Sequence, residues 1–521
     1  MRREGDVFRG NPRRKADNSA LVMIGRRTQT HVRIARRPLV MHNRMTNSSG
    51  RGKGRSTACL KVRRQSKKAR LGVGILIEIV TDSAIGEAGL AKRAMHRVSW
   101  RLMPFLTFSF LICYIDRVNL GFAALQMNAA VGIDPKTYGL GAGILYLGYF
   151  FLEVPSNLAL ERFGARKWIG RIMISWGAVS MACALIKGPA SFLILRFLLG
   201  AAEAGFFPGV VLYLTYWYPA EYRARIVGLL SLALPVAGLI GSPLSGIILS
   251  GMDGLASVSG WRWLFIIEGA PAVILGVFAM FFLTDRPADA KWLTETQRQW
   301  LKKTLEIEHA RAQRVPSMPL WRVLSNKYVL IMALAYAGAG GAAIVLTLWM
   351  PQLVRSFGFG NTQNGLFAAV PFGIAAVCMF LWARNSDRTG ERVWHNAIPL
   401  IGLAAAIAAF YFTVNQFWPT LVLLVITAIG SYASKGPFWA LSSEWLGPKV
   451  AAAGLAQINA LGTLAAFFFS YMIGWIQAET NSFALAILPI AIVSALGALG
   501  VIAAGASQQK KATAGSQRAA T

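Results

Sequence analysis

The chain has 521 residues, of which 55% are hydrophobic and only 15% charged, and its formal net charge is +31. This composition excludes a soluble globular protein of this length, because the apolar residues occur in long blocks. Apolar runs recur from residue 102 to about residue 505, and at roughly 20 residues each can cross about 30 Å of hydrocarbon as a helix. Strict two-residue alternation is absent, so we expect an all-α membrane protein.

The cysteines and histidines give no sign of a metal site or a disulfide framework. Four cysteines and five histidines are present. The cysteines show no paired spacing and the histidines show no ligand spacing. We therefore expect no metal and no cofactor. No nucleophile or phosphate-cradling motif stands out either, which argues against an enzyme.

Residues 1–99 are predicted to form a basic, disordered N-terminal extension. Much of the positive charge lies in its first 70 residues, which lack the apolar core of a signal peptide, and the apolar stretch 71–80 is too short to span a membrane. Three interpretations are open: a basic arm lying on anionic lipid, an arginine-rich targeting segment, or an upstream extension that is not translated. We favour the third, with Met95 as the start. Nucleic-acid binding is not expected, because the segment has no interleaved aromatic residues or recognisable module.

The remaining chain is predicted to contain two groups of six membrane spans. We expect a first six-helix bundle over residues 100–283, a cytoplasmic linker over 284–327, a second bundle over 328–505 and a cytoplasmic tail over 506–521. Lysine and arginine are concentrated in the loops after the even-numbered spans, in the linker and in the tail. The positive-inside rule therefore places both termini and the linker in the cytoplasm of a multi-pass inner-membrane protein. The predicted spans lie near residues 102–124, 138–160, 168–187, 191–214, 225–250, 262–283, 328–354, 364–384, 396–413, 417–440, 450–475 and 483–505.

One loop motif occurs in both halves of the chain. ERFGARK at 161–167 and DRTGERV at 387–393 share the order acid, Arg, any residue, Gly, any residue, Arg, and each follows the second span of its half. Internal repeats of this kind are typical of secondary transporters. We expect the motif to gate the cytoplasmic face through contacts of acids with arginines or helix termini; setting the topology alone is the open alternative for its basic members. The residues concerned are Glu161, Arg162, Gly164, Arg166, Asp387, Arg388, Gly390 and Arg392.

Four ionisable residues stand out within the predicted spans. Asp116 and Arg117 are neighbours in the first span, and Arg196 and Glu203 share one face of the fourth. An ionised side chain in the bilayer costs on the order of several kcal/mol unless it is paired, wetted or neutralised, so it normally faces a cavity. Adjacent residues on a helix point about 100° apart, so Asp116 and Arg117 are expected to serve separate partners. A static network of salt bridges is the alternative to a functional site.

Several stretches carry a family resemblance: YIDRVNLGFAAL, YGLGAGILYLGYFFLEVPSNLALERFGARKW, RFLLGAAEAGFFPGVVLYLTYWYP, WRWLFIIEGAPA, LWMPQ and AAAGLAQINALG. They resemble the major facilitator superfamily, and more narrowly its anion:cation symporter family of organic-anion transporters. The resemblance extends from Trp100 to about Gly505. It implies twelve transmembrane helices in two pseudo-symmetric six-helix bundles.

The charged residues indicate a proton-coupled symport. Arg117 and Arg196 would hold a substrate carboxylate, since a guanidinium keeps its proton and grips carboxylates bidentately. Asp116 and Glu203 would gain a proton outside and release it inside, and they would compete with the substrate for the arginines. The resemblance implies the same roles for the acid and arginine positions of spans one and four.

Five further residues are candidates for substrate binding, with plain helix packing as the open alternative. Tyr114 and Tyr149 can donate hydrogen bonds to an anion. Trp439 and Asn459 match positions that contact substrate in the resembled family. Lys435 can add a positive charge to the pocket or extend toward the cytoplasm.

We therefore expect a secondary active transporter that imports a small organic anion, such as a sugar acid, a dicarboxylate or an aromatic carboxylate, by proton symport with alternating access. Its partners would be that anion, protons and the lipid bilayer, without nucleic acid, and it would act as a monomer. A proton-coupled exporter of amphipathic compounds is the second hypothesis. A non-transporting membrane sensor is the third, but the short amphipathic linker offers it no folded output domain.

Overall fold

The computed structural model describes residues 55–313, 322–323, 325–413 and 415–520. In these ranges the chain is almost entirely helical and contains no β-strand. The internal contacts divide the chain into two units, Met1–Val80 and Thr81–Thr521. The described residues of the first unit are helical and belong to α1 (Arg55–Val131), which continues into the second unit. Most of the predicted N-terminal extension lies outside the described residues.

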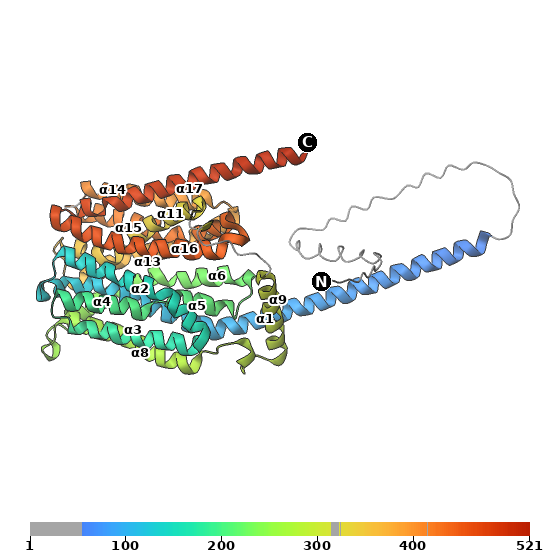
Figure 1. The fold of residues 1–521 in the computed structure, drawn as a ribbon, viewed down its shortest axis with the longest axis horizontal. Helices are drawn as coiled ribbons and strands as arrows, with labels where there is room; N and C mark the ends of the chain where they lie inside the picture. Colours follow the sequence, from blue (N-terminus) through green and yellow to red (C-terminus); the bar gives the residue numbers. More distant parts are fainter. Residues whose placement is uncertain (1–54, 314–321, 324, 414, 521) are drawn as a thin grey trace, which may run out of the picture. The chain divides into compact units, whose positions relative to one another are not determined.

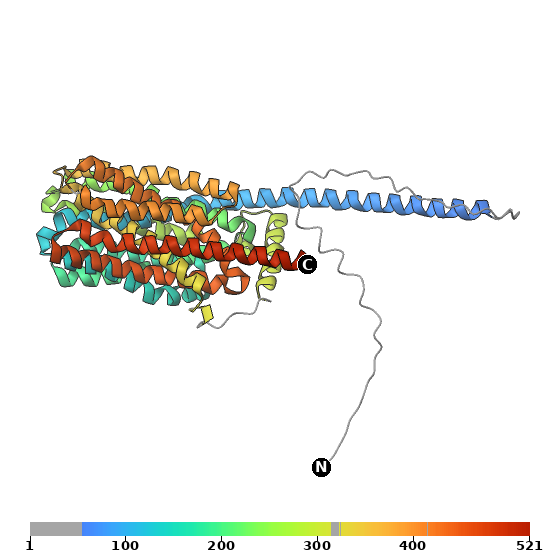
Figure 2. The same ribbon diagram turned by 90° about the horizontal axis from the view of Figure 1, so that it is seen from above.

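The described part of the second unit contains 12 helices that are long and apolar enough to cross a membrane, which confirms the predicted all-α class. The linker helix α9 (Glu295–Gln313) separates the first six from the last six. Figures 1 and 2 show the spanning helices running side by side, with α9 lying across their ends. The candidate spans are Gly86–Val131, Pro135–Phe163, Ala165–Leu185, Pro189–Thr215, Ala220–Gly251, Gly260–Phe282, Lys327–Arg355, Asn361–Thr389, Val393–Phe412, Phe417–Gly447, Ala453–Thr480 and Phe483–Lys510.

The fourth span of the first bundle is interrupted directly after an acidic residue. Its helix α4 ends at Glu203, and α5 begins at Phe206. Between them Gly205 has a φ of +85°, a conformation that glycine adopts without steric cost. The break leaves Glu203 at the end of a helix near the middle of the span. The helices of this bundle after α1 are α2 (Pro135–Phe163), α3 (Ala165–Ala182), α4 (Pro189–Glu203), α5 (Phe206–Thr215), α6 (Ala220–Ser231), α7 (Ala233–Gly251) and α8 (Gly260–Phe282).

The second bundle contains two local departures from a regular α-helix. The turn Val345–Trp349 is a π-helix that joins α11 to α12. Gly447, with a φ of +62°, breaks α16 where the tenth span ends. The helices of this bundle are α11 (Lys327–Ile344), α12 (Met350–Arg355), α13 (Asn361–Thr389), α14 (Val393–Ala409), α15 (Phe417–Ala433), α16 (Lys435–Thr480) and α17 (Phe483–Ala520).

Glycines let the two bundles pack closely at the end opposite the linker. Gly139 of α2 lies against the backbone of Ser470 and Gly474 in α16. In the same way Gly365 of α13 lies against the backbone of Ser242 in α7. Small residues allow this close approach of helix backbones within a membrane. Because each contact joins helices of different bundles, both must separate if this end opens.

Candidate functional site

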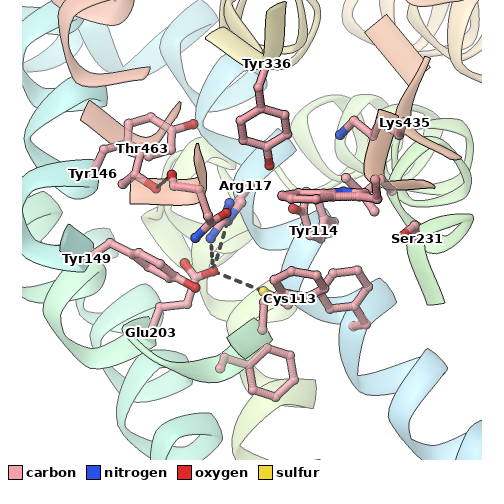
Figure 3. Close-up of a pocket in the computed structure, with 16 residues that line it drawn as sticks. Cys113, Tyr114, Arg117, Tyr146, Tyr149, Glu203, Ser231, Tyr336, Lys435 and Thr463 are labelled. Atoms are coloured by element: carbon pink, nitrogen blue, oxygen red, sulfur yellow. Dashed lines mark hydrogen bonds and ion pairs between the residues drawn. The ribbon is translucent and has the colours of Figure 1, made fainter. Parts of the chain in front are cut away.

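A cavity of about 110 Å³ lies between the two bundles. The first bundle contributes residues of α1, α2 and α4 to α7 to its wall, and the second contributes residues of α11 and α16. Figure 3 shows the labelled side chains converging on this space. The wall carries two basic residues and one carboxylate among aromatic rings. It is lined by Phe110, Cys113, Tyr114, Arg117, Tyr146, Tyr149, Glu203, Phe206, Phe207, Ser231, Leu234, Tyr336, Lys435, Trp439, Asn459 and Thr463.

Arg117 and Glu203 form an ion pair in the wall of this cavity. The Nε of Arg117 donates to Oε1 of Glu203 at 2.9 Å, and Nη2 donates to the same oxygen (Figure 3). The thiol of Cys113 also donates to that oxygen, at 3.1 Å. Glu203 is buried, with 3% of its surface exposed. The carboxylate is therefore neutralised by an arginine that also reaches the cavity.

Aromatic rings enclose the guanidinium of Arg117. Its Cζ lies 5.0 Å from the ring centroid of Tyr114 and 5.7 Å from that of Tyr149. These distances suit cation–π attraction, which stabilises a cation where water is scarce. Tyr114 is three residues before Arg117 on α1, and Cys113 is four residues before it, so all three share one helix face.

The wall from the second bundle contains the other basic residue. The Nζ of Lys435 lies 5.0 Å from the ring centroid of Tyr432. The rings of Trp439 and Tyr336 pack with their centroids 5.4 Å apart. Asn459 donates from Nδ2 to Oε1 of Glu153 in α2 at 3.1 Å, so one side-chain hydrogen bond joins the bundles beside the cavity.

Asp116 and Arg196 do not line the cavity. The Asp116 carboxylate is buried and accepts hydrogen bonds from Ser180 of α3 and from Asn119. Arg196 is buried too, donates from Nε to the carbonyl oxygen of Gly141 at 3.3 Å, and leaves Nη1 without a partner. Of the nine residues predicted for proton coupling or substrate binding, the other seven share the cavity. The roles of all nine stay predictions.

The family of the chain follows from its match to a known sequence family. The model of the family described as Major Facilitator Superfamily matches residues 106–470. The chain belongs to the Major Facilitator Superfamily. The match covers most of both bundles, and it confirms the family resemblance of the six sequence stretches.

Individual relatives of this Major Facilitator Superfamily protein have been named for different cargoes. A protein of Agrobacterium vitis that carries the name of a tartrate transporter is 45% identical over 408 residues, which cover 78% of this chain and 90% of the relative. The quinolone resistance transporter of Acinetobacter baumannii is 40% identical over 407 residues, covering 78% of this chain and 93% of the relative. The crystal structure of a bacterial homologue of the human lysosomal transporter Spinster, inward-facing, matches with a TM-score of 0.62 at 18% identity, covering 78% and 97% of the two chains. This last likeness shows the fold alone.

The repeated loop motif of this Major Facilitator Superfamily protein makes ion pairs in both halves of the chain. In the first bundle the backbone N–H of Arg166 donates to Oδ1 of Asp285 at 2.8 Å, and its Nε lies 3.9 Å from Oδ2. In the second bundle Arg392 pairs with Asp387 at 2.7 Å and with Glu444 at 3.7 Å. Gly164 and Gly390 adopt positive φ values of 87° and 67° at the helix ends.

The other charged members of the predicted gating motif form no ion pair in the part of the chain that the structure describes. Within the described ranges, Glu161, Arg162 and Arg388 have no ion pair shorter than 4.0 Å. The gating role of the motif stays a prediction.

Sequence reasoning missed several residues that line or flank the cavity, among them Cys113, Tyr146, Glu153, Tyr336 and Thr463. Helical spacing could have found three of them, because they lie three or four residues from Arg117, Tyr149 and Asn459. Tyr336 carries no such signal, because it lies in an apolar run. Glu153 could also have been predicted, because an acidic residue within a membrane span is itself a sign of a functional site.

Proposed function

We propose that this protein imports a small organic anion together with protons across the inner membrane by alternating access. The 45% identity to a relative named for tartrate supports an organic acid as cargo. The two basic residues in the cavity wall support an anion. Basic residues in the linker and in the loops of the same side support a cytoplasmic location of both termini.

The Arg117–Glu203 ion pair is the observation that carries the proposal. A substrate carboxylate can take the guanidinium only if Glu203 releases it, because two carboxylates at one site repel each other. Protonation of Glu203 from outside removes this competition, so the proton and the anion bind together. Loss of the proton inside restores the ion pair and displaces the anion. Proton and anion therefore move in the same direction.

Two features favour a compact dicarboxylate within this substrate class. Arg117 comes from the first bundle and Lys435 from the second, so an anion with two carboxylates can contact both walls. The cavity of about 110 Å³ is also smaller than the roughly 300–1,000 Å³ of sites for drug-sized ligands. Tartrate, for which a relative is named, has this size and charge.

Uptake into proteoliposomes tests the proposal. The purified protein would be assayed with a panel of radiolabelled sugar acids, dicarboxylates and aromatic carboxylates, with and without an inward proton gradient. We expect accumulation of at least one class above equilibrium only when the gradient is present. Transport that ignores the gradient, or no transport of any organic anion, would contradict the proposal.

Lys435→Gln should weaken binding of dicarboxylates selectively. A hydrogen bond to a charged group contributes about 1.5–3 kcal/mol, so we expect the half-saturation concentration of a dicarboxylate to rise roughly 10- to 100-fold. A monocarboxylate of similar size should be affected much less, because Arg117 alone can hold it. Competition assays with the two compounds measure the difference, and Lys435→Arg is the charge-retaining control. Equal losses for both compounds would place Lys435 outside the second carboxylate site.

Gly139→Val should open the bundles at the end opposite the linker. The new side chain would collide with the backbone of Ser470 and Gly474, which has no flexible group to move aside. In a protein whose single cysteine is Cys113, a residue of the cavity wall, a membrane-impermeant thiol reagent added at that end should label several-fold faster than in the unsubstituted protein. Gly251→Val is the matched control at the same end, because a side chain there meets no atom within 4 Å. Unchanged labelling of the Gly139→Val protein would argue against the proposed opening.

Export of amphipathic compounds is the second candidate function, and one observation favours it. The quinolone resistance transporter is 40% identical to this chain. The ion pair and the lysine of the cavity wall fit this candidate less well, because an amphipathic compound does not need two fixed cations. Increased resistance of cells that express the protein, without gradient-driven uptake of any organic acid, would establish the exporter instead.

A further inference from the structure

A second polar network lies in the first bundle, apart from the cavity. Its members are Asp116 and Asn119 of α1, Ser180 of α3, Ser245 of α7 and Glu268 of α8, and none is more than 4% exposed. The hydroxyl of Ser245 donates to Oε1 of Glu268 at 2.8 Å. At the other end, Asp116 Oδ1 accepts from Ser180 and from Nδ2 of Asn119, the latter at 2.9 Å. None of these five residues lines the cavity.

Two atoms in the middle of this network have no partner. They are Oδ1 of Asn119 and Oε2 of Glu268. The Asn119 side chain also lies within hydrogen-bonding reach of the Glu268 carboxyl group. Both free atoms are oxygens, so neither can donate a hydrogen bond to the other while Glu268 is ionised. A single proton on Glu268 Oε2 would complete the chain from α7 to α3.

One shared proton would satisfy the free oxygen atoms in either orientation of the asparagine side chain. A carboxamide has one end that donates and one end that accepts. Here Nδ2 donates to Asp116, and the free oxygen can accept a hydrogen bond from a protonated Glu268. If the carboxamide turns over, Glu268 becomes the carboxylate and Asp116 must hold the proton. One proton would therefore give a hydrogen-bond partner to the free oxygen atoms of both Asn119 and Glu268.

The charged surroundings leave Glu268 without another source of neutralisation. Within the described ranges, no lysine or arginine lies within 4.0 Å of it, and Asp116 is the charged group that acts on it. Asp116 in turn experiences Arg196 and Glu203 of α4, and Cys183 lies near both Asp116 and Arg196. An unpaired carboxylate at such a buried place is strongly disfavoured.

We propose that Asp116 and Glu268 share one proton through Asn119, and that this proton is taken up and released in each transport cycle. Both ends of the network lie next to groups that are expected to move or bind substrate during the transport cycle. Asp116 adjoins Arg117 of the cavity wall, and Ser245 adjoins Gly246, which lies against the backbone of Asn361 and Gly365 in the second bundle. Separation of the bundles at this contact would admit water to Glu268, and water can take the proton away. No covalent bond to carbon is made or broken; a proton moves between carboxyl oxygens and water.

This inference extends the proposed proton symport and rests on it, so its test has one measurement that needs no transport. Infrared spectroscopy of the full-length protein in liposomes should show the C=O stretching band of a buried, protonated carboxyl group. Glu268→Gln should remove this band, because glutamine supplies the missing N–H to Asn119 and leaves Asp116 ionised. The same substitution keeps the hydrogen-bonded chain, so we expect the variant to fold.

The second measurement is the number of protons that enter with each substrate, from a trapped pH dye and labelled substrate in the same vesicles. Glu268→Gln should lower this ratio by one proton while substrate counterflow stays within severalfold of the unsubstituted protein. Glu295→Gln is the matched control, because this exposed acid of α9 interacts at the surface with Arg298 and Gln299 of the same helix. It should leave both the band and the ratio unchanged.

Three results would overturn the proposal: a band that survives in Glu268→Gln, an unchanged proton ratio in that variant, or uptake driven by a sodium gradient alone. The last would assign the oxygen atoms of this network to a metal cation. If no organic anion is transported at all, the proposed function fails, but the infrared band still decides whether Glu268 holds a proton.

Discussion

Arg117→Ala should abolish transport of organic anions. The substitution removes the guanidinium that would hold the substrate carboxylate, and it leaves the buried Glu203 without its cation. Truncating one partner of a buried, hydrogen-bonded charge pair at a binding interface costs about 2–5 kcal/mol of binding free energy, so we expect the affinity to fall by at least about 30-fold. Substrate counterflow in proteoliposomes measures transport, and ligand-induced thermal stabilisation of the detergent-solubilised protein measures binding.

Arg117→Lys separates the charge of Arg117 from its shape. Lysine keeps the positive charge but cannot offer two N–H groups in one plane, so we expect it to restore only a small part of the activity. Arg298→Ala, at a partly exposed position of α9, is the control for expression and insertion. Full counterflow by the Arg117→Ala protein would show that the substrate is held elsewhere.

Glu203→Gln should separate exchange from accumulation. Glutamine has the shape of a protonated glutamate, so Arg117 is released permanently for the substrate carboxylate. We expect counterflow to persist within severalfold of the unsubstituted rate, with a half-saturation concentration that is unchanged or lower. Uptake against a gradient should disappear, because no proton is then released in exchange for the ion pair.

Parallel assays of counterflow and of uptake driven by a pH gradient test the second result. Glu295→Gln is the matched control for an exposed glutamate, and it should behave normally in both assays. Accumulation by the Glu203→Gln protein at the normal rate would remove this residue from the coupling mechanism. Loss of counterflow as well would indicate that the carboxylate positions Arg117 instead of competing for it.

The spanning helices could be predicted from composition because lipid imposes one simple requirement. Each span must satisfy its backbone hydrogen bonds internally and cover about 30 Å of hydrocarbon, so a long apolar run is sufficient to find it. Local breaks within the helices could not be predicted from composition in this way. The glycine at 205 that ends α4, and the π-helical turn at Val345–Trp349, depend on packing against neighbouring helices.

The charged residues of the site could be predicted from the sequence, but which of them lie together could not. Asp116, Arg117, Arg196 and Glu203 stand out because an ion within a span is costly unless it has a function. The structure places Arg117 and Glu203 together at the cavity and turns Asp116 toward Ser180 and Asn119. Glu268 lies in one of the stretches that carry the family resemblance, but the sequence offered no reason to assign it a role. Its partners lie on α1 and α7, far away along the chain.

The amino-acid sequence by itself determined that the chain spans a membrane with two groups of six helices, and which acids and arginines lie within them. These properties depend on side-chain chemistry and on distances along one helix. Tertiary structure alone decided which of these charges meet, because residues from α1 and α4, or from α1 and α8, come together only when the helices pack. The physical reason is that electrostatic and hydrogen-bonding partners are chosen by distance in space, and that distance is set by close contacts such as those of Gly139 and Gly365.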